Sequence, residues 1–575
     1  MPSIRAQYAQ NVILEHQVLL AKSKAGLPPL RPPWRKKNGE PIRIGILGAG
    51  IAGLYAALLI DYLGPESGIT YDILEANPDR TGGRLYTHRF SDSPNDYFDA
   101  GAMRYPKIPW MKPTFALFKF LNLDDPKLLI PYHLRDLRGN NIRHFNNISI
   151  SSACLEAADA RGDFDPFATK VDGLTDTTNN LIGHKLDPFK HMLTEDFQSG
   201  WEALMSVDQW SMRDWLALPV DNSQPAYPEP LIKYLETFTS STVQASSTVH
   251  CRRRSLMRWT STISQHPSGS PFKEAERVIS NAVIERLTRP VQRGRRVTAI
   301  APIFEAESTK PTALKVTTTS ESGLVDSEYA HIISTMPFGC LRMVDTSALE
   351  FPWELQTGLR TLHYDSAIKV AVKFKTRWWE KLPPAPEDAT MIVSYTWAQD
   401  ALRIGAYVKG HESASEQVLL EHIKRDLADM HDIKDMSVLD HVDHKIVNWY
   451  GDEYSGGAFA LFGPGQFSSM YCQVTQPILG MFHFAGEATS VHHAWVVGSL
   501  NSAYRSVLEI LIHENNLAMI EKLTSPDCPF SRPNEIDCIL TMVQVAIGQS
   551  HQLSQPKAEP ATSVIQQGTW LSLLR

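Results

Sequence analysis

The glycines from Gly48 to Gly53 form a GxGxxG run, Gly-Ala-Gly-Ile-Ala-Gly, between two segments of different apolar periodicity. Isoleucines alternate before the run, as in a strand, and apolar residues recur at helical spacing after it, up to Gly64-Pro65. In such a turn Gly48 permits the tight bend, Gly50 lets backbone N–H groups approach a diphosphate, and Gly53 lets the helix pack on the strand. The positive end of the helix then faces the phosphates. The run therefore predicts a dinucleotide site.

Two further features extend this predicted site. Glu75 closes the next expected strand about 20 residues after Gly53, the spacing of a carboxylate that accepts hydrogen bonds from ribose hydroxyls. Arg80 and the triplet Gly82-Gly83-Arg84 follow it. Arginine can neutralise diphosphate charge through two parallel hydrogen bonds, and glycines let the chain pass close to a ligand. Alone, this segment would indicate a surface turn, but its place after Glu75 favours binding.

Together these motifs resemble the flavin-dependent amine oxidase family. The segment Asp99–Pro106, Asp-Ala-Gly-Ala-Met-Arg-Tyr-Pro, looks like the GxMR segment of L-amino-acid oxidases. The segment Phe482–Val507 resembles the C-terminal FAD-binding block, particularly that of fungal L-amino-acid oxidases, and Asn448-Trp449 with Ser455–Phe467 also matches. The matched blocks cover about residues 42–106 and 290–513, with gaps.

The resemblance implies FAD as cofactor and an α/β fold. That fold has a Rossmann-like FAD-binding domain built from discontinuous segments, a mixed-sheet substrate-binding domain and a helical insertion. Monoamine oxidases carry a flavin-bonded cysteine after Ser-Gly-Gly; here that position is Ala458, so we expect non-covalent FAD. In the family, Glu487 matches a residue that contacts the ribityl-pyrophosphate part of FAD. The residues expected at the cofactor are Gly48, Gly50, Ala52, Gly53, Glu75, Ala76, Arg80, Gly83, Arg84, Gly101, Ala102, Met103, Arg104, Val297, Glu487 and Trp495.

The resemblance also assigns residues to the substrate. Arg104 matches the family arginine that binds the substrate carboxylate, a pairing that suits the two-pronged guanidinium. Lys369 matches the family lysine that holds a water near flavin N5 and is the predicted catalytic residue, although the alternation around it would by itself indicate a solvated lysine face. Trp449, Ala494 and Trp495 are expected to line the substrate cavity. His492 and His493 lack a metal-ligand spacing, and we expect no metal site.

Three features depart from the family pattern. The tyrosine-bearing stretch that follows Trp378-Trp379-Glu380 in L-amino-acid oxidases has no counterpart near residues 381–390, which indicates a deletion, and Tyr395 is not an obvious replacement. Near residues 260–270 the usual Gly-Gly pair is missing after Trp259, and the preceding Arg252–Arg254 run is expected to be a solvated surface patch. The extension past residue 515 matches nothing.

The resulting hypothesis is an FAD-dependent L-amino-acid oxidase that converts an L-amino acid and oxygen into a 2-oxo acid, ammonia and hydrogen peroxide. A flavin amine oxidase for a non-amino-acid amine or larger metabolite is the first alternative, which the missing tyrosine segment favours. A flavin-binding protein without turnover is the second. The expected partners are the small amine or amino acid and molecular oxygen; a homodimer is left open.

The elements that must position these residues suggest the following organisation. Strands are expected at 296–304, 312–318, 331–337, 364–374 and 480–485, and helices at 416–430 and 498–513. The expected domain boundaries are 1–41 (N-terminal arm), 42–110, 275–350 and 476–515 (FAD-binding segments), 111–150 and 351–475 (substrate domain), 151–274 (helical domain) and 516–575 (C-terminal extension, partly disordered).

Composition limits the remaining classes. The chain has 575 residues, 43% of them hydrophobic and 21% charged, so it can bury a sizeable core. Its net charge of −7 argues against nucleic-acid binding. Six scattered cysteines without a CxxC pair argue against a disulfide scaffold or zinc ribbon. No secretory signal or membrane span is recognised, and we expect an intracellular, cytoplasmic protein.

Overall fold

The computed structural model of the chain describes residues 41–125, 127–129, 139–145, 147–159, 171, 176–219, 226–238, 269–270, 275–306, 308–380 and 389–530. Several of the expectations above fall outside these residues. They concern the N-terminal arm up to residue 40, the Arg252–Arg254 run, the segment around Trp259, most of the apparent deletion near 381–390, and the chain after Phe530. These expectations stay predictions, as do the domain boundaries.

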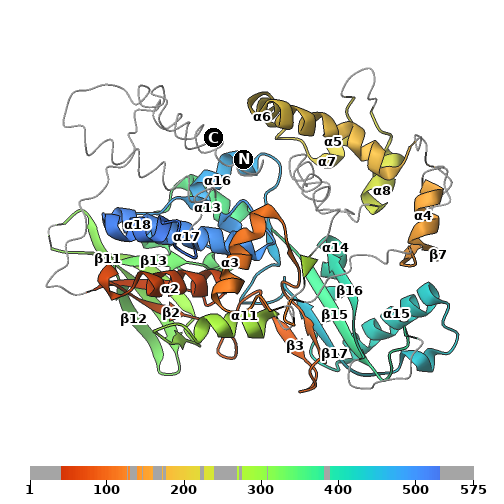
Figure 1. Cartoon of the computed structure of the whole chain (residues 1–575), viewed down its shortest axis with the longest axis horizontal. Helices are drawn as coiled ribbons and strands as arrows, with labels where there is room; N and C mark the ends of the chain where they lie inside the picture. The colour runs from red at the N-terminus through yellow and green to blue at the C-terminus, as the bar shows by residue number, and fades with distance from the viewer. Residues whose placement is uncertain are drawn as a thin grey trace.

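A parallel sheet of five strands forms the centre of the part of the molecule that contains α2 (Figure 1). Its strands are, in spatial order, β19 (Phe482–Phe484), β13 (His331–Ser334), β1 (Ile42–Leu47), β2 (Ile69–Leu74) and β9 (Val291–Gln292). β1 is the middle strand, and its Ile44 pairs with His331 on one side and with Tyr71 on the other. Strands from distant parts of the chain thus share one sheet, which confirms the predicted α/β fold assembled from discontinuous segments.

Helices α2 (Ile51–Leu63) and α17 (Val496–His513) lie side by side on one face of this sheet (Figure 1). Every residue of α2 except Asp61 and Tyr62 is buried, because α11 (Ala275–Ile284) and α18 (Leu517–Thr524) also contact it. A helix covered on most sides is apolar on most sides, which explains its continuous apolar sequence. The helix predicted after the glycine run is confirmed as α2, and the helix predicted at 498–513 is confirmed as α17, which begins two residues earlier than expected.

The first residues of the C-terminal extension complete this core. Phe530 is fully buried, and its ring meets those of Tyr55, Tyr62 and Phe120 at centroid distances of 5.6, 5.3 and 4.6 Å. The hydroxyl of Tyr504, in α17, donates to the carbonyl of Leu523 in α18 at 2.8 Å. The sequence assigned no role to this segment, yet up to Phe530 it belongs to the nucleotide-domain core.

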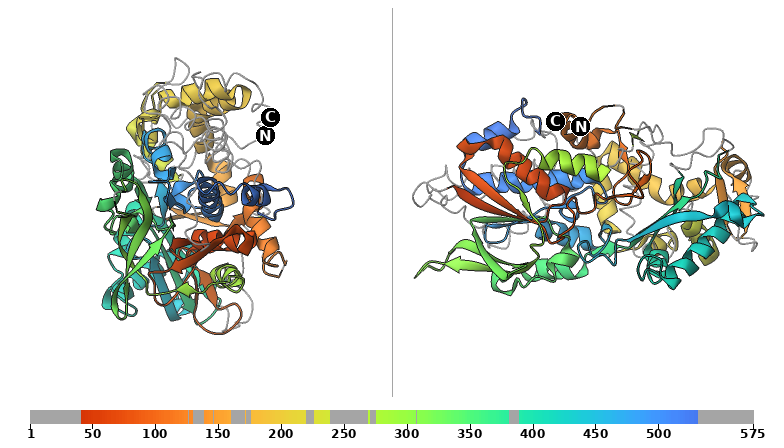
Figure 2. Two further views of the ribbon diagram at one scale, coloured as in Figure 1. Left: turned by 90° about the vertical axis from the view of Figure 1, so that its left-hand side faces the viewer. Right: turned by 90° about the horizontal axis from the view of Figure 1, so that it is seen from below.

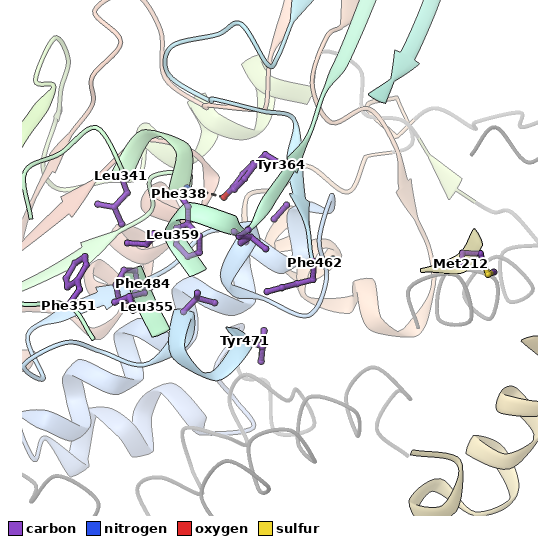
Figure 3. Packing of buried hydrophobic residues seen from close by; sticks show 14 of the residues in the cluster. Met212, Phe338, Leu341, Phe351, Leu355, Leu359, Tyr364, Phe462, Tyr471 and Phe484 are labelled. Atoms are coloured by element: carbon purple, nitrogen blue, oxygen red, sulfur yellow. Dashed lines mark hydrogen bonds between the residues drawn. The ribbon is translucent and has the colours of Figure 1, made fainter. Parts of the chain in front are cut away.

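The opposite face of the parallel sheet is covered by an antiparallel three-stranded sheet of β10 (Val297–Phe304), β11 (Pro311–Ser320) and β12 (Gly323–Tyr329). Its apolar residues join a large cluster with α12 (Phe338–Leu341), α13 (Trp353–Thr361) and α16 (Gln466–Thr475). Figure 3 shows part of this cluster, in which the backbone N–H of Phe338 donates to the hydroxyl of Tyr364 at 3.1 Å. The cluster supports the floor of the site described below.

A second antiparallel sheet carries the predicted catalytic lysine. Its strand order is β16 (Thr390–Trp397), β15 (Ala367–Phe374) and β17 (His441–Asn448), and α15 (Ala414–His431) packs on one face. The predicted single strand 364–374 is wrong in one respect. Residues 363–365 form a separate strand, β14 (His363–Asp365), which pairs with β18 (Phe459–Leu461), and the chain bends at Ser366, whose hydroxyl donates to the Ala398 carbonyl.

The helical insertion contains α4 (Ser152–Asp159), α5 (Thr178–Glu195), α6 (Phe197–Ser206), α7 (Met212–Leu216) and α8 (Glu229–Phe238). Figure 2 shows the parallel sheet and the second antiparallel sheet at opposite ends of an elongated molecule.

The remaining short strands and α-helices are β3 (Thr87–Arg89), β4 (Tyr97–Asp99), β5 (Tyr105–Pro106), β6 (Ile142–Phe145), β7 (Ile148–Ser151), β8 (Gly269–Ser270), α3 (Lys112–Phe120) and α14 (Ala398–Gly405). Among the helices in the described ranges, none is long and apolar enough to cross a bilayer.

Candidate active site

A cavity of about 320 Å³ opens at the carboxyl ends of the parallel strands and extends toward the second antiparallel sheet. This is where ligands bind in open α/β sheets, and the volume is in the range of small-molecule sites. Its walls come from the turn before α2, the ends of β2 and β13, the start of β10, and the segments that carry Arg84, Gly101, Tyr395, Trp449, Tyr454, Glu487 and Trp495.

The glycine turn forms one end of the cavity. Gly48 has φ +104°, and its N–H donates to the Leu74 carbonyl at 2.8 Å, so the turn is fixed against β2. A side chain on Gly53 would overlap the carbonyl of Gly48, which gives Gly53 a packing role rather than a place in the cavity wall. Gly50 caps α2 without a side-chain hydrogen bond, and the first turn holds no acidic residue. The backbone N–H groups there suit the diphosphate of a dinucleotide.

Glu75 lies at the end of β2 in the wall of the same end. Its carboxylate accepts hydrogen bonds from the N–H groups of Ala49 at 2.7 Å and Asn77 at 2.8 Å. Burial raises the pKa of this carboxyl above its ordinary value, and the two N–H donors offset part of that shift. The carboxylate thus has a fixed orientation beside the glycine turn, as an acceptor of ribose hydroxyls requires.

Glu487 joins its own segment to two others, which carry Arg84 and Ala460. It follows β19, is buried, and accepts a hydrogen bond from the guanidinium of Arg84 at 3.1 Å. The backbone N–H groups of Ala460 and Ala494 also donate to it, at 3.0 and 2.8 Å. Arg84 in turn donates to the carbonyl of Ala458 at 3.0 Å. This cluster holds the C-terminal block against the Gly82-Gly83-Arg84 loop at the middle of the cavity.

Lys369 lies in β15, behind the cavity wall. Its side chain is buried, with 1% of the residue exposed, so Lys369 is not part of the solvated face that the alternation alone would indicate. Its Nζ donates to the carbonyls of Asp99 at 2.9 Å and Gly101 at 2.8 Å and lies 4.7 Å from the centre of the Tyr395 ring. Burial lowers its pKa to about 7; the nearby charge of Asp99 opposes this and that of Arg104 adds to it.

The loop that Lys369 holds carries the predicted carboxylate-binding residue. Gly101 and Ala102 line the cavity, and Met103 places its sulfur 3.5 Å from the Lys369 Nζ. Arg104 follows and is half-buried. Of the predicted site residues, all line the cavity except Gly53, Met103, Arg104 and Lys369.

Two aromatic residues, Trp449 and Trp495, line the cavity, and further rings pack near them. The indole N–H of Trp449 donates to the carbonyl of Ala100 at 3.1 Å, and the ring is buried. Trp495 lies edge-on to Trp110 at 5.5 Å, and Trp110 stacks on His492 at 5.0 Å. His493 stacks instead on Phe462 at 4.9 Å. The two neighbouring histidines therefore belong to different ring stacks.

Several residues of the cavity wall were not predicted from the sequence. Tyr395 had no assigned role, yet it lines the cavity and pairs with Lys369 across β15 and β16. Aligning these two strands as a hairpin would have placed both residues on one face. The other missed residues have no local signal; they include Arg295, Arg296, Thr335, Met336, Pro337, Cys340, Glu453 and Tyr454.

Comparison with known proteins identifies relatives along most of the chain. A putative bifunctional amine oxidase from Dictyostelium discoideum is 34% identical over 83% of this chain. The match covers 47% of that relative's length, so this chain spans about half of it. L-amino-acid oxidase 4 from Hebeloma cylindrosporum is 29% identical over 88% of this chain and 86% of its own. Cyclohexylamine oxidase from Brevibacterium oxydans IH-35A has a similar fold, with a TM-score of 0.59 and 16% identity, and the match covers 83% of this chain and all of that structure.

The family itself is recognised over one continuous range. The profile described as flavin containing amine oxidoreductase matches residues 51–511, which include Gly53 at the end of the glycine turn, Lys369 and Glu487. The uncapped start of α2, the oriented Glu75 carboxylate and the glycines without room for side chains fit a flavin dinucleotide. The chain therefore belongs to the flavin-containing amine oxidoreductase family and is a flavin-dependent amine oxidoreductase.

Proposed function

We propose that this enzyme is an L-amino-acid oxidase that binds FAD non-covalently. The observation that carries the proposal is the position of Arg104: its guanidinium follows the Gly101–Ala102 part of the cavity wall and is close enough to lower the pKa of Lys369. A cation that keeps its charge at all working pH values is the group that recognises a carboxylate. The similarity to a fungal L-amino-acid oxidase supports the same assignment.

The chain's own residues would then divide the work as follows. Arg104 binds the substrate carboxylate, and the rings of Trp449 and Trp495 exclude water from the reacting carbon. Lys369 anchors the loop before Arg104 through two carbonyls and, with a pKa of about 7, places little positive charge beside the substrate amine in alkaline solution. Bound FAD supplies the acceptance of two electrons and their transfer to oxygen. The overall products are a 2-oxo acid, ammonia and hydrogen peroxide.

Anaerobic reduction tests the substrate class. The flavin absorption near 450 nm of the purified enzyme should bleach with some of the twenty L-amino acids and not with the corresponding amines that lack the carboxylate. Arg104→Ala should lower the rate constant of bleaching by about 100-fold or more for amino acids, the loss expected for a charge-assisted contact of about 3 kcal/mol. Equal bleaching by amines and amino acids would contradict the proposal.

The cofactor linkage has its own test. Because Ala458 offers no nucleophile, acid precipitation should leave the protein colourless and FAD in the supernatant. A yellow precipitate would contradict non-covalent binding.

A second candidate, an oxidase of simple amines, is favoured by one observation. Arg104 does not line the cavity, so a substrate seated there need not contact it. In that case Arg104→Ala leaves turnover of the preferred amine unchanged, which separates the two candidates in the same assay.

A further inference from the structure

A cluster of histidines and carboxylates lies at the far side of the second antiparallel sheet, outside the cavity. His444 is in β17, Glu416 is in the first turn of α15, and His411 is in the loop before that helix. Figure 1 shows α15 beside β17 at the end of the molecule away from α2. The side chains of His444 and Glu416 are only 2% and 4% exposed, whereas that of His411 is 55% exposed. Two groups are thus built into the fold and one is open to solvent.

The donor atoms of these three residues converge. The Nε2 of His444 lies 3.0 Å from Oε2 of Glu416, and the donor atoms of His411, Glu416 and His444 all lie within 4.8 Å of one another. The donors around a tetrahedral zinc ion, at bonds of about 2.0–2.2 Å, are about 3.3–3.5 Å apart. The buried pair is already near this spacing, and the donor atom of the exposed His411 lies within 4.8 Å of both.

Neighbouring groups orient these donors. The N–H of Gly410 donates to Oε1 of Glu416 at 3.3 Å, which directs Oε2 toward His444. The Nε2 of His411 lies 3.3 Å from Oδ1 of Asp443. A carboxylate beside one ring nitrogen favours the tautomer that carries the proton there, and this leaves the lone pair of the other nitrogen for a cation. Glu416 and Asp443 together supply the two negative charges that balance a divalent ion.

From this arrangement we propose that His411, Glu416 and His444 form a binding site for a divalent transition-metal ion, with Zn²⁺ as the best fit and Asp443 as the residue that orients His411. The two imidazoles are borderline donors, and together with one carboxylate they favour zinc over magnesium or calcium, which prefer oxygen donors alone. A bound ion would fasten the loop before α15 to β17, an edge strand of the sheet. The proposal is independent of the substrate assigned above.

A second group, His331, His513 and Glu514, also brings three donor atoms together, but it suits an ion less well. Both ring nitrogens of His331 already face partners, His483 at 3.2 Å and Glu514 at 2.7 Å, and the His331 side chain is 1% exposed. An ion there would have to displace these contacts and has no exposed ligand through which to enter. The experiment below distinguishes the two groups.

The test uses the full-length, flavin-loaded protein, stripped with a chelator and then titrated with ZnCl₂. We expect one tightly bound zinc per chain by elemental analysis after dialysis, and a rise in the melting temperature as zinc is added. His411→Ala changes an exposed side chain and should leave the protein folded but weaken zinc binding by at least about tenfold. Asp443→Asn should weaken binding by about tenfold, because it removes only the orienting charge.

His422→Ala is the matched control, since His422 is exposed in the same helix α15 and should leave zinc affinity unchanged. Three outcomes would overturn the proposal. The wild-type protein takes up no zinc, the His411→Ala variant binds zinc with wild-type affinity, or binding persists in His411→Ala but is lost in His513→Ala. The last outcome would place the ion in the second group.

Discussion

The two ends of the cavity are built in different ways. At the cofactor end the contacts come mostly from backbone: the Gly48 turn, the uncapped start of α2 and the loop at Gly83, all close together in sequence. At the end toward the second antiparallel sheet, side chains cross between distant segments, as Lys369 does to the Asp99 and Gly101 carbonyls and Trp449 to the Ala100 carbonyl. Backbone contacts tolerate sequence change wherever small residues remain, whereas a buried side chain that loses its partner leaves an unsatisfied polar group.

Glu487 lies between the two ends, and its removal should have the largest effect. Glu487→Ala leaves the Arg84 guanidinium without its carboxylate and the N–H groups of Ala460 and Ala494 without an acceptor. Breaking a buried charge pair in this way costs about 3–5 kcal/mol of the free energy of unfolding. Urea unfolding followed by circular dichroism, at saturating flavin, measures it.

Glu487→Gln provides the control, because its amide oxygen still accepts from the two N–H groups while the charge is lost. We expect its destabilisation to be intermediate. If Glu487→Ala unfolded at the wild-type urea concentration, the junction would not depend on this carboxylate, and the contrast between the two ends would need revision.

Lys369 tests the end toward the second antiparallel sheet, through the pH dependence of stability. Its pKa in the folded protein is about 7, below the ordinary value of 10.5. Between these two pH values the unfolded chain binds more protons than the folded one, so the free energy of unfolding rises with pH. The cost of burying the charged amine is fully present below pH 7 and is relieved as the pH rises toward 10.5. The wild type should therefore gain about 2–3 kcal/mol of stability relative to Lys369→Met between pH 7 and pH 9.

The measurement is the unfolding free energy of the wild type minus that of Lys369→Met at several pH values. The titration of all other groups cancels in this difference. A difference that stays constant over this range would mean that the amine keeps its proton, and that burial does not shift its pKa as stated.

The contrast between the ends also explains what the sequence could and could not predict. The turn at Gly48–Gly53, helix α2 and Glu75 follow from residues within one βαβ unit, where spacing alone fixes geometry. The burial of Lys369 could not follow from local alternation, because the carbonyls that it meets belong to a loop about 270 residues earlier. The break at Ser366 and the core position of Phe530 were missed for the same reason: each depends on a partner from another segment.

The cluster of His411, Glu416 and His444 shows most clearly which contacts the sequence does not predict. The spacing of these residues follows no metal-binding motif, and the expectation of no metal site rested on such motifs. Only the packing of α15 on the sheet brings Glu416 to His444. The Glu487 cluster was partly predictable, because the family resemblance assigned Glu487 to the cofactor, but its pairing with Arg84 appears only in the fold.

The smallest expected effect concerns an ion pair at the cavity rim. Arg296, at the start of β10, pairs with Glu453, and its guanidinium lies 4.8 Å from the ring centre of Tyr454; the three residues line the cavity. The side chains of Arg296 and Glu453 are 38% and 67% exposed, so water screens the pair. Glu453→Ala should therefore change the unfolding free energy by less than about 1 kcal/mol.

The same substitution should still speed flavin release, because it frees the Arg296 side chain at the edge of the cofactor cavity. Dissociation followed by the return of flavin fluorescence on dilution measures this, with Glu521→Ala, an exposed acid in α18 and outside the cavity wall, as control. A loss of stability as large as that of Glu487→Ala would contradict the contrast drawn here, because an exposed pair at the rim would then matter as much as the buried one. A wild-type release rate would show instead that the pair of Arg296 and Glu453 takes no part in retaining the cofactor.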